Sequence, residues 1–451
     1  MQANNRHYWL KSGTLNLLLN VQSLIFAFGS FFLLVRLLDK HSFGIWALFV
    51  ATTSIFETAR NGLVQNALIK FLSSGKPEEH PAILSASFII SGALMLICIA
   101  INLSLATYFA RIWNDPELVS MFYSFVIVYL LQGALAQFQW IEQAHLSFQG
   151  TVITNFIRQG GFFVLVLIGF LLHWEVSLIK LVYLQGACAL LGLTTEYFFV
   201  RKYLGFSFVY NKSWLWKLFN YGKFVFGTSL GAILSNTINQ MMLGGMISVD
   251  AAGVYNVALR ITNVADIPTN AVGAIVFPQS ARRFAEQGNQ AGKYMFEKSV
   301  GTILALLVPG LALVLIFPHF VVNVIAGNRY GEAIPIMRIT IVTCLFNPFQ
   351  RMFGTIMDSM GRPKINFILI LSFLGVNLLL TYLLVRSSGI MGAVYATFLA
   401  DLIFFIIMQL ILRSSFDVHF INTFRYAYQF YPDFFKTYAR PFFVRAGILK
   451  P

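Results

Sequence analysis

Apolar residues dominate the chain in long blocks that short polar turns separate. Most blocks are about 20–30 residues long, enough for a helix to cross a bilayer. We predict twelve transmembrane segments at residues 12–38, 43–71, 81–110, 117–141, 150–172, 176–200, 216–246, 252–281, 298–318, 332–357, 364–385 and 389–412. The pattern therefore predicts an all-α integral membrane protein.

The segments are expected to form two sets of six. The motif FGIW at residues 43–46 is matched about 210 residues later by AGVY at residues 252–255. Six spans repeated in the same orientation predict two parallel six-helix lobes, related by an axis along the membrane normal. We place the N-terminal lobe at residues 1–205 and the C-terminal lobe at residues 206–413.

The remaining residues, 414–451, differ from the rest of the chain. Their segment FRYAYQFYPDFFKTYARPFFVRAG interleaves aromatic residues with Arg and Lys. Amphipathic basic and aromatic segments bind membrane surfaces, so we expect a tail on the cytoplasmic surface. The alternatives are an unstructured tail near lipid headgroups and a surface that binds a partner enzyme.

The distribution of Lys and Arg predicts the orientation in the membrane. Twenty of them fall in segments on the same side as the N-terminus, and five fall on the other side. Because basic residues concentrate on the cytoplasmic side, both termini are predicted to be cytoplasmic. The net charge of +14 is then explained by the anionic inner leaflet, so we expect no nucleic-acid partner.

Seven further cations lie at membrane depth. A charge facing lipid at the bilayer centre costs about 2.5–3.5 kcal/mol, so we expect these side chains to face water or an anionic ligand in a cavity between helices. Local ion pairs of Glu57 with Arg60 and of Arg351 with Asp358 are also expected. The alternative for several of these cations is that they extend to the membrane interface. The seven residues are Arg36, Arg60, Arg158, Lys223, Arg260, Arg338 and Arg351.

Acidic and cysteine residues within the segments suggest few further roles. Glu57, Asp266 and Asp401 are candidates for binding a coupling proton or Na⁺, or are structural partners of nearby cations. The three cysteines lie in apolar segments without metal-site spacing, so we expect free thiols and no metal site. The chain has no GxxxxGK[ST] motif, so we expect neither ATP hydrolysis nor a bound cofactor.

Several segments resemble one family of transporters. FGIWALF, RNGLVQNALIKF, AAGVYNVALRI, IPTNAVGAIVFPQSARRF, MDSMGRPKINFILILSFLGVNLLLTYLLV and GIMGAVYATFLADLI are similar to the polysaccharide transporters of the MOP flippase superfamily, which includes Wzx-type O-antigen flippases and MATE exporters. The resemblance covers about residues 10–413.

The resemblance implies a flippase of the bacterial inner membrane. Such proteins move an oligosaccharide linked to undecaprenyl pyrophosphate, such as an O-antigen, capsule or exopolysaccharide unit, from the inner to the outer leaflet. Two lobes open alternately to either side. Related peptidoglycan-precursor flippases carry cavity arginines in spans 1, 2 and 8, where this chain has Arg36, Arg60 and Arg260.

Two other classes of function remain as alternatives. An ion-coupled, MATE-like exporter of organic cations is less compatible with the excess of positive charge at membrane depth. A membrane-bound polymerase or ligase would need a catalytic loop on the outer face, and the outer connections are short. We therefore expect a transporter rather than an enzyme, with a lipid-linked glycan and membrane lipid as its partners.

Overall fold

The protein is helical throughout the part that its structure describes. The structure is a computed structural model that describes residues 2–174, 176–204, 209–273, 276, 280, 289–360 and 362–435. These residues include no strand. Nine helices among them are long and apolar enough to cross a membrane, or ten if one bent pair forms a single span. The predicted all-α membrane fold is confirmed, and the count of twelve spans stays a prediction.

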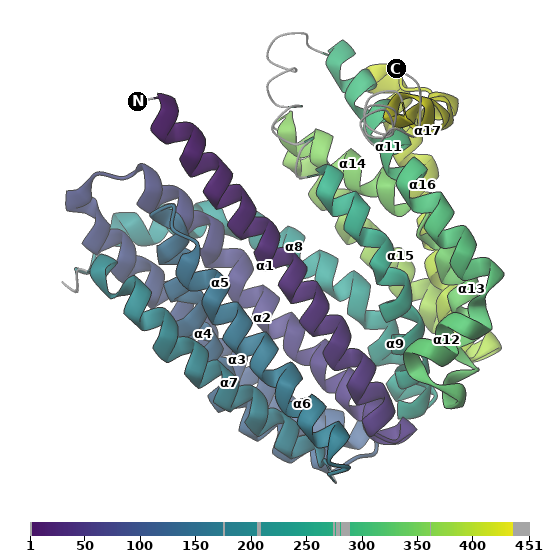
Figure 1. Cartoon of the computed structure of the whole chain (residues 1–451), viewed down its shortest axis with the longest axis horizontal. Coiled ribbons are helices and arrows are strands. Elements are labelled where there is room, and N and C mark those ends of the chain that lie inside the picture. The colour runs from purple at the N-terminus through teal and green to yellow at the C-terminus, as the bar shows by residue number, and fades with distance from the viewer. Residues whose placement is uncertain are drawn as a thin grey trace, which may run out of the picture. The chain divides into compact units, whose positions relative to one another are not determined.

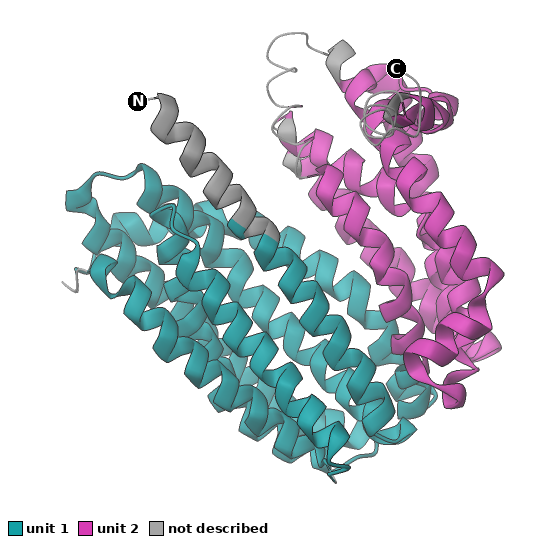
Figure 2. Ribbon diagram, viewed as in Figure 1, with its two compact units in different colours: residues 1–253 teal, residues 254–451 magenta. Residues whose placement is uncertain are grey.

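The chain forms two compact units, residues 1–253 and 254–451 (Figures 1 and 2). The N-terminal unit contains α1 (Gln2–Leu37), α2 (Lys40–Ser74), η1 (Pro77–Glu79), α3 (His80–Ile112), α4 (Glu117–Ala144), α5 (Gln149–Asn155), η2 (Phe156–Gly160), α6 (Gly161–Leu171), α7 (Leu178–Val200), η3 (Arg201–Tyr203), α8 (Lys212–Met246) and the start of α9 (Val249–Thr262).

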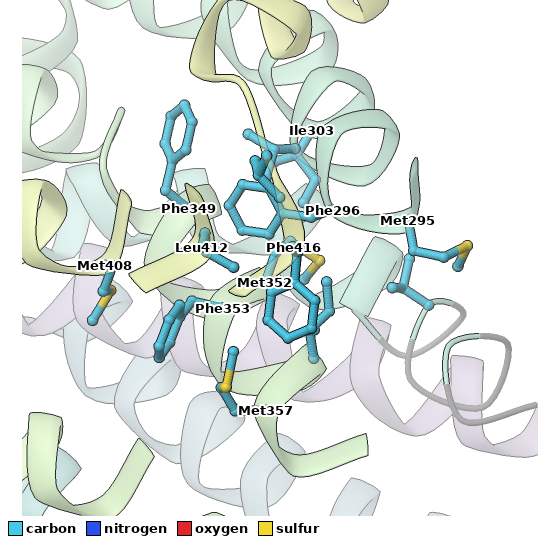
Figure 3. Close-up of a cluster of buried hydrophobic side chains, with 14 of the residues drawn as sticks. Met295, Phe296, Ile303, Phe349, Met352, Phe353, Met357, Met408, Leu412 and Phe416 are labelled. Carbon is cyan, nitrogen blue, oxygen red and sulfur yellow. The ribbon is translucent and has the colours of Figure 1, made fainter. Parts of the chain in front are cut away.

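The C-terminal unit contains the rest of α9, η4 (Asn263–Ala265), α11 (Asn289–Ile316), α12 (Pro318–Ala326), η5 (Asn328–Tyr330), α13 (Ala333–Thr343), α14 (Asn347–Ser359), α15 (Pro363–Ser388), α16 (Ile390–Phe416) and α17 (Phe420–Phe434). Residues 266–273 are also helical. Its apolar core combines side chains of α11, α14 and α16, including the fully buried Phe296 and Phe353 (Figure 3).

The boundary between the compact units lies after Gly253, because α8 packs with the N-terminal helices, and the two predicted lobes stay a prediction. Residues 205 and 206, between which we placed the lobe boundary, lie outside the described residues. Contact between α2 and α8 is close: a Cβ atom at Gly222 would meet the carbonyl oxygen of Leu63. A Cβ atom at Gly62 lies only 3.2 Å from the Cα atom of Phe226 when placed ideally. Small residues allow such close approach of membrane helices.

The fifth predicted segment is interrupted in a way that the sequence did not indicate. It consists of α5, a π-helical turn at Phe156–Gly160 and α6. Phe148, the residue before α5, provides no side-chain hydrogen bond to cap the start of the helix. The buried Glu142 of α4 takes that role. Its carboxylate accepts hydrogen bonds from the backbone N–H groups of Gly150 at 2.8 Å and Thr151 at 2.7 Å. The carboxylate therefore satisfies donors that a helix leaves unpaired at its start.

The tenth predicted segment is bent. α13 and α14 meet at an angle of 41°, and Pro348 lies in the first turn of α14. Proline there lacks only an N–H group that a helix start leaves unpaired, so it suits the beginning of a new helix.

The tail forms α17, which packs along α11. The side chain of Glu297 on α11 accepts hydrogen bonds from the backbone of His419 and the side chain of Asn422, and the Tyr431 hydroxyl donates to the carbonyl of Ala305 at 2.7 Å. Ile421, Phe424 and Tyr428 are exposed on another side of the helix. Of the predicted tail, residues 436–451 lie outside the described residues, and its membrane placement stays a prediction.

The contact between α2 and α8 generates a test of the N-terminal unit. We expect Gly222→Val to lower the free energy of unfolding by about 3 kcal/mol, because the added side chain must push the Leu63 carbonyl aside. Thermal unfolding in detergent measures the effect. Gly92→Val is the matched control, since a Cβ atom at Gly92 meets nothing within 4 Å. Equal melting temperatures for the two variants would contradict this packing.

Candidate anion-binding site

Arg60 is a buried cation in the middle of α2. Its side chain is 3% exposed and lies between α2 and α4. Nε donates to Oδ1 of Asn61 at 3.1 Å, and Nη1 donates to the backbone carbonyl of Tyr129 at 3.4 Å. The guanidinium carbon lies 5.0 Å from the centre of the Tyr129 ring, within range of a cation–π interaction.

The expected ion pair between Glu57 and Arg60 is not formed. Among the described residues, no carboxylate lies within ion-pair distance of Arg60. The two residues share a face of α2, but the Arg60 side chain turns toward the Tyr129 carbonyl of α4. A guanidinium has five N–H donors and the hydrogen bonds above occupy two, so Arg60 retains donors for another partner.

Arg158 lies on the π-helical turn η2 and completes a cluster with Arg60. Its side chain is partly exposed, and Nη2 donates to Oδ1 of Asn155 at 3.2 Å. The carboxylate of Glu57 lies close enough to interact electrostatically with both Arg60 and Arg158. We call Glu57, Arg60 and Arg158 the Arg60 cluster. Single π-helical turns occur frequently at functional sites, so the position of Arg158 on η2 supports a role beyond packing.

Two other predicted cations of the N-terminal unit have different surroundings. The guanidinium of Arg36, near the end of α1, lies 3.8 Å from the centre of the Phe32 ring. Lys223 on α8 is exposed, and Nζ donates to Oδ1 of Asn220 at 3.0 Å. Exposure is compatible both with a position in a cavity and with a side chain that extends to the interface, so the role of Lys223 stays a prediction.

The predicted cations of the C-terminal unit are exposed. They are Arg260 on α9, Arg338 on α13 and Arg351 on α14. The expected ion pair of Arg351 with Asp358 is not formed within the described residues; instead, Asp358 accepts hydrogen bonds from the side-chain amide of Asn366, the shorter at 3.2 Å. Arg351 interacts with Asp358 and Asp266 electrostatically, at longer range.

The two predicted acids of the C-terminal unit are held by amides of α14. Asn347 donates to Oδ1 of Asp266 at 3.1 Å, and Gln350 donates to Oδ1 of the buried Asp401 at 2.9 Å. Because Asn347 and Gln350 are three residues apart, they lie on one face of α14. Each acid thus has a neutral hydrogen-bond donor as its partner, an arrangement that leaves its protonation state open to change.

Tyr129 and Asn155 were not among the predicted site residues. Tyr129 supplies the carbonyl and the ring that hold Arg60, and Asn155 supplies the oxygen that holds Arg158. Asn155 had a signal in the sequence, because it is polar and lies three residues before an arginine in an apolar segment. Tyr129 had none, since its backbone carbonyl could not be distinguished from any other.

The chain matches a protein-family model. Residues 9–284 match the model described as "Polysaccharide biosynthesis protein". This match covers more than half of the chain, including the whole Arg60 cluster.

Curated proteins from archaea and bacteria are similar to parts of the chain. "Uncharacterized membrane protein MJ1068" of Methanocaldococcus jannaschii is 25% identical over 48% of this chain and 42% of its own length. "Probable low-salt glycan biosynthesis flippase Agl15" of Haloferax volcanii is 23% identical over 41% and 39%. "Lipopolysaccharide biosynthesis protein WzxC" of Escherichia coli is 19% identical over 90% and 82%. The matches to the two archaeal proteins thus span less than half of their lengths.

Solved structures share the fold at low identity. An inward-facing MATE-family multidrug resistance transporter of the MOP superfamily aligns with a TM-score of 0.73 and 15% identity, over 88% of this chain and 94% of its own. The lipid II flippase MurJ aligns with a TM-score of 0.72 and 10% identity, over 91% and 90%. These likenesses show a shared fold. The predicted resemblance to polysaccharide transporters is confirmed by the family match, and the apolar helices support a multi-pass membrane protein.

The buried charge of Arg60 generates a prediction about stability. Replacing a buried, incompletely paired cation with an apolar side chain of similar length is often neutral or stabilising. We therefore expect Arg60→Met to leave the melting temperature in detergent unchanged or to raise it. A large decrease would show instead that Arg60 holds α2 to α4 as a structural clamp. Gln65→Met, a polar-to-apolar change on the same helix, is the matched control.

Proposed function

Because the chain belongs to the polysaccharide biosynthesis protein family, we propose that it moves a lipid-linked, anionic glycan across a membrane. The proposed substrate is an oligosaccharide on a polyprenyl pyrophosphate carrier, undecaprenyl pyrophosphate in bacteria. The proposed direction is from the inner to the outer leaflet of the inner membrane, with both termini in the cytoplasm. WzxC and Agl15, whose names refer to lipopolysaccharide and glycan biosynthesis, support this choice.

The observation that carries the proposal is Arg60, a buried guanidinium that has no carboxylate partner in the part of the chain that the structure describes. Burying an unpaired charge costs several kcal/mol, so a protein that retains one has a use for it. A pyrophosphate offers oxygen atoms with the geometry that a guanidinium binds through two parallel hydrogen bonds. Arg158, the second cation of the cluster, would add to the attraction of the same headgroup.

Glu57 gives the proposed site a resting state. Its carboxylate interacts with both arginines and partly offsets their mutual repulsion when no substrate is present. Because no direct ion pair fixes Glu57 to Arg60, an incoming pyrophosphate would not have to break one. The free energy of binding would then be the difference between two interactions of Arg60: a weak one with the distant Glu57 carboxylate, and a stronger one with a directly bound pyrophosphate.

The proposed transport follows alternating access, as the resemblance implies. Arg36, Lys223, Arg260, Arg338 and Arg351 are proposed contacts of the anionic headgroup before and after the Arg60 cluster. Asp266 and Asp401, held by neutral amides, remain candidates for coupling to a proton or Na⁺. We propose no enzymatic step, and a polysaccharide biosynthesis enzyme as partner remains a proposal as well.

The charge of the Arg60 cluster favours an anionic substrate over an organic cation. Two arginines and one carboxylate leave the cluster with a net positive charge, which would repel a cationic drug. The fold shared with a MATE-family transporter does not alter this, since similar folds serve different substrates.

Transport in proteoliposomes tests the proposal. We expect the wild-type protein to move a fluorescent polyprenyl-pyrophosphate oligosaccharide between leaflets, measured by quenching from outside. Arg60→Ala should abolish this movement. Arg60→Lys keeps the charge but loses the paired hydrogen bonds, so we expect a loss of about tenfold, equivalent to about 1.4 kcal/mol.

The matched control is Arg111→Ala, which removes an exposed arginine outside the cluster. It should transport at the wild-type rate. Wild-type rates in Arg60→Ala would contradict the proposed site, and transport of an organic cation in place of the glycan would favour the exporter alternative.

A further inference from the structure

Two buried acids lie side by side at the start of α5, and the Arg60 cluster does not include them. Glu142 of α4 is 1% exposed and Glu196 of α7 is 0% exposed. Oγ1 of Thr151 donates to Glu142 at 2.7 Å, and Oγ1 of Thr154 donates to Glu196 at 2.8 Å. The two threonines are three residues apart and lie on one face of α5. The two carboxyl groups that they contact are therefore neighbours, and they interact directly.

The two carboxyl groups have unequal hydrogen bonding. Both oxygen atoms of Glu142 accept, from Oγ of Ser147, the backbone of Gly150, and the backbone and side chain of Thr151. Four donors directed at one carboxylate stabilise its ionised form. From the residues that the structure describes, Glu196 accepts a single hydrogen bond, at Oε2, and its buried Oε1 has no hydrogen-bond partner among them.

Such a pair cannot readily hold two negative charges. Neighbouring carboxylates repel each other, and burial removes the water that would stabilise them. A proton on Oε1 of Glu196 removes one of the two charges and turns this atom into a hydrogen-bond donor beside the Glu142 carboxylate. The arrangement therefore specifies which acid holds the proton.

We propose that Glu196 is a proton-binding site, and that the protein binds and releases one proton there in each transport cycle. Na⁺ is a less suitable ligand, because it needs several oxygen atoms with free lone pairs. In this pair the Glu142 oxygens already accept four hydrogen bonds, and only Oε1 of Glu196 accepts none.

The charged surroundings of Glu196 point to what the proton controls. α7 packs against α4, α5, η2, α6 and η3. α5 and α6 contain no ionisable residue. On the other elements, Glu142 of α4 interacts with Glu196, η2 carries Arg158, and η3 carries Arg201, Lys202 and Tyr203. Arg201 and Lys202 are exposed, whereas Arg158 is partly buried.

Arg158 and Glu196 lie on neighbouring elements, and each is about one helical turn from a residue that contacts the other element. It follows Thr154, the partner of Glu196, by four residues. Its Cβ atom lies 3.7 Å from the position of a Cβ atom at Gly192, which precedes Glu196 by four residues. A deprotonated Glu196 would therefore attract Arg158, whereas a protonated Glu196 would leave Arg158 available to an anion. This last step rests on the proposed function.

Infrared spectroscopy of the full-length protein in liposomes tests the site without a glycan. We expect a protonated-carboxyl band that disappears as pH rises, and we expect Glu196→Gln to lose it. Glu78→Gln, which changes an exposed acid of η1, is the matched control and should keep the band. A wild-type band in Glu196→Gln would overturn the proposal, as would loss of the band on adding NaCl at constant pH.

A second variant covers the case in which Glu196→Gln does not fold. Thr154→Val keeps the shape of Thr154 but removes its hydrogen bond to Glu196. We expect it to displace the pH midpoint of the same band by about one unit, the scale of one such hydrogen bond. An unchanged midpoint would contradict the assignment of the band to Glu196.

A transport assay separates this proposal from the proposed function. In proteoliposomes with labelled polyprenyl-pyrophosphate oligosaccharide, a pH gradient should increase the wild-type transport rate several-fold. The rate of Glu196→Gln should be nearly the same with and without the gradient. If the wild-type protein moves no glycan while the infrared band behaves as expected, the proposed function fails and the proton site stands. If Glu196→Gln retains the full stimulation, coupling through Glu196 is wrong.

Discussion

The proposed function depends on the energetic cost of burying a guanidinium among packed membrane helices. Placing such a charge at the bilayer centre costs about 2.5–3.5 kcal/mol even with local adjustment. The structure compensates Arg60 only in part, with the oxygen of Asn61, the carbonyl of Tyr129 and the face of its ring. Donors of Arg60 remain for a further partner, and an anionic headgroup is the partner that we propose.

The rest of the N-terminal unit positions this charge and its neighbours. Contact between α2 and α8 at Gly222 fixes the helix that carries Arg60. The carboxylate of Glu142 holds the start of α5, and the π-helical turn that follows carries Arg158. The same carboxylate is then the neighbour of Glu196, so one side chain both caps a helix and sets the electrostatic environment of the proposed proton site.

The all-helical class and several segment boundaries could be predicted from sequence because they depend on local composition. The apolar blocks gave helices close to their predicted ends, as for 117–141 and α4. Side-chain partners could not be predicted in this way. Glu57 and Arg60 share a helix face, yet Arg60 pairs with the distant Tyr129 carbonyl. The proximity of Glu142 and Glu196 could not be predicted either, since it depends on how α4, α5 and α7 pack.

The most direct measurement is the distance between Arg60 and the pyrophosphate of a bound substrate. Solid-state NMR can detect dipolar coupling between a ¹³C-labelled guanidinium and ³¹P in liposomes that contain the protein and a polyprenyl-pyrophosphate oligosaccharide. Comparison with Arg60→Lys identifies the signal of this arginine. We expect a coupling that corresponds to direct hydrogen bonding. Saturating substrate without any coupling at Arg60 would contradict it.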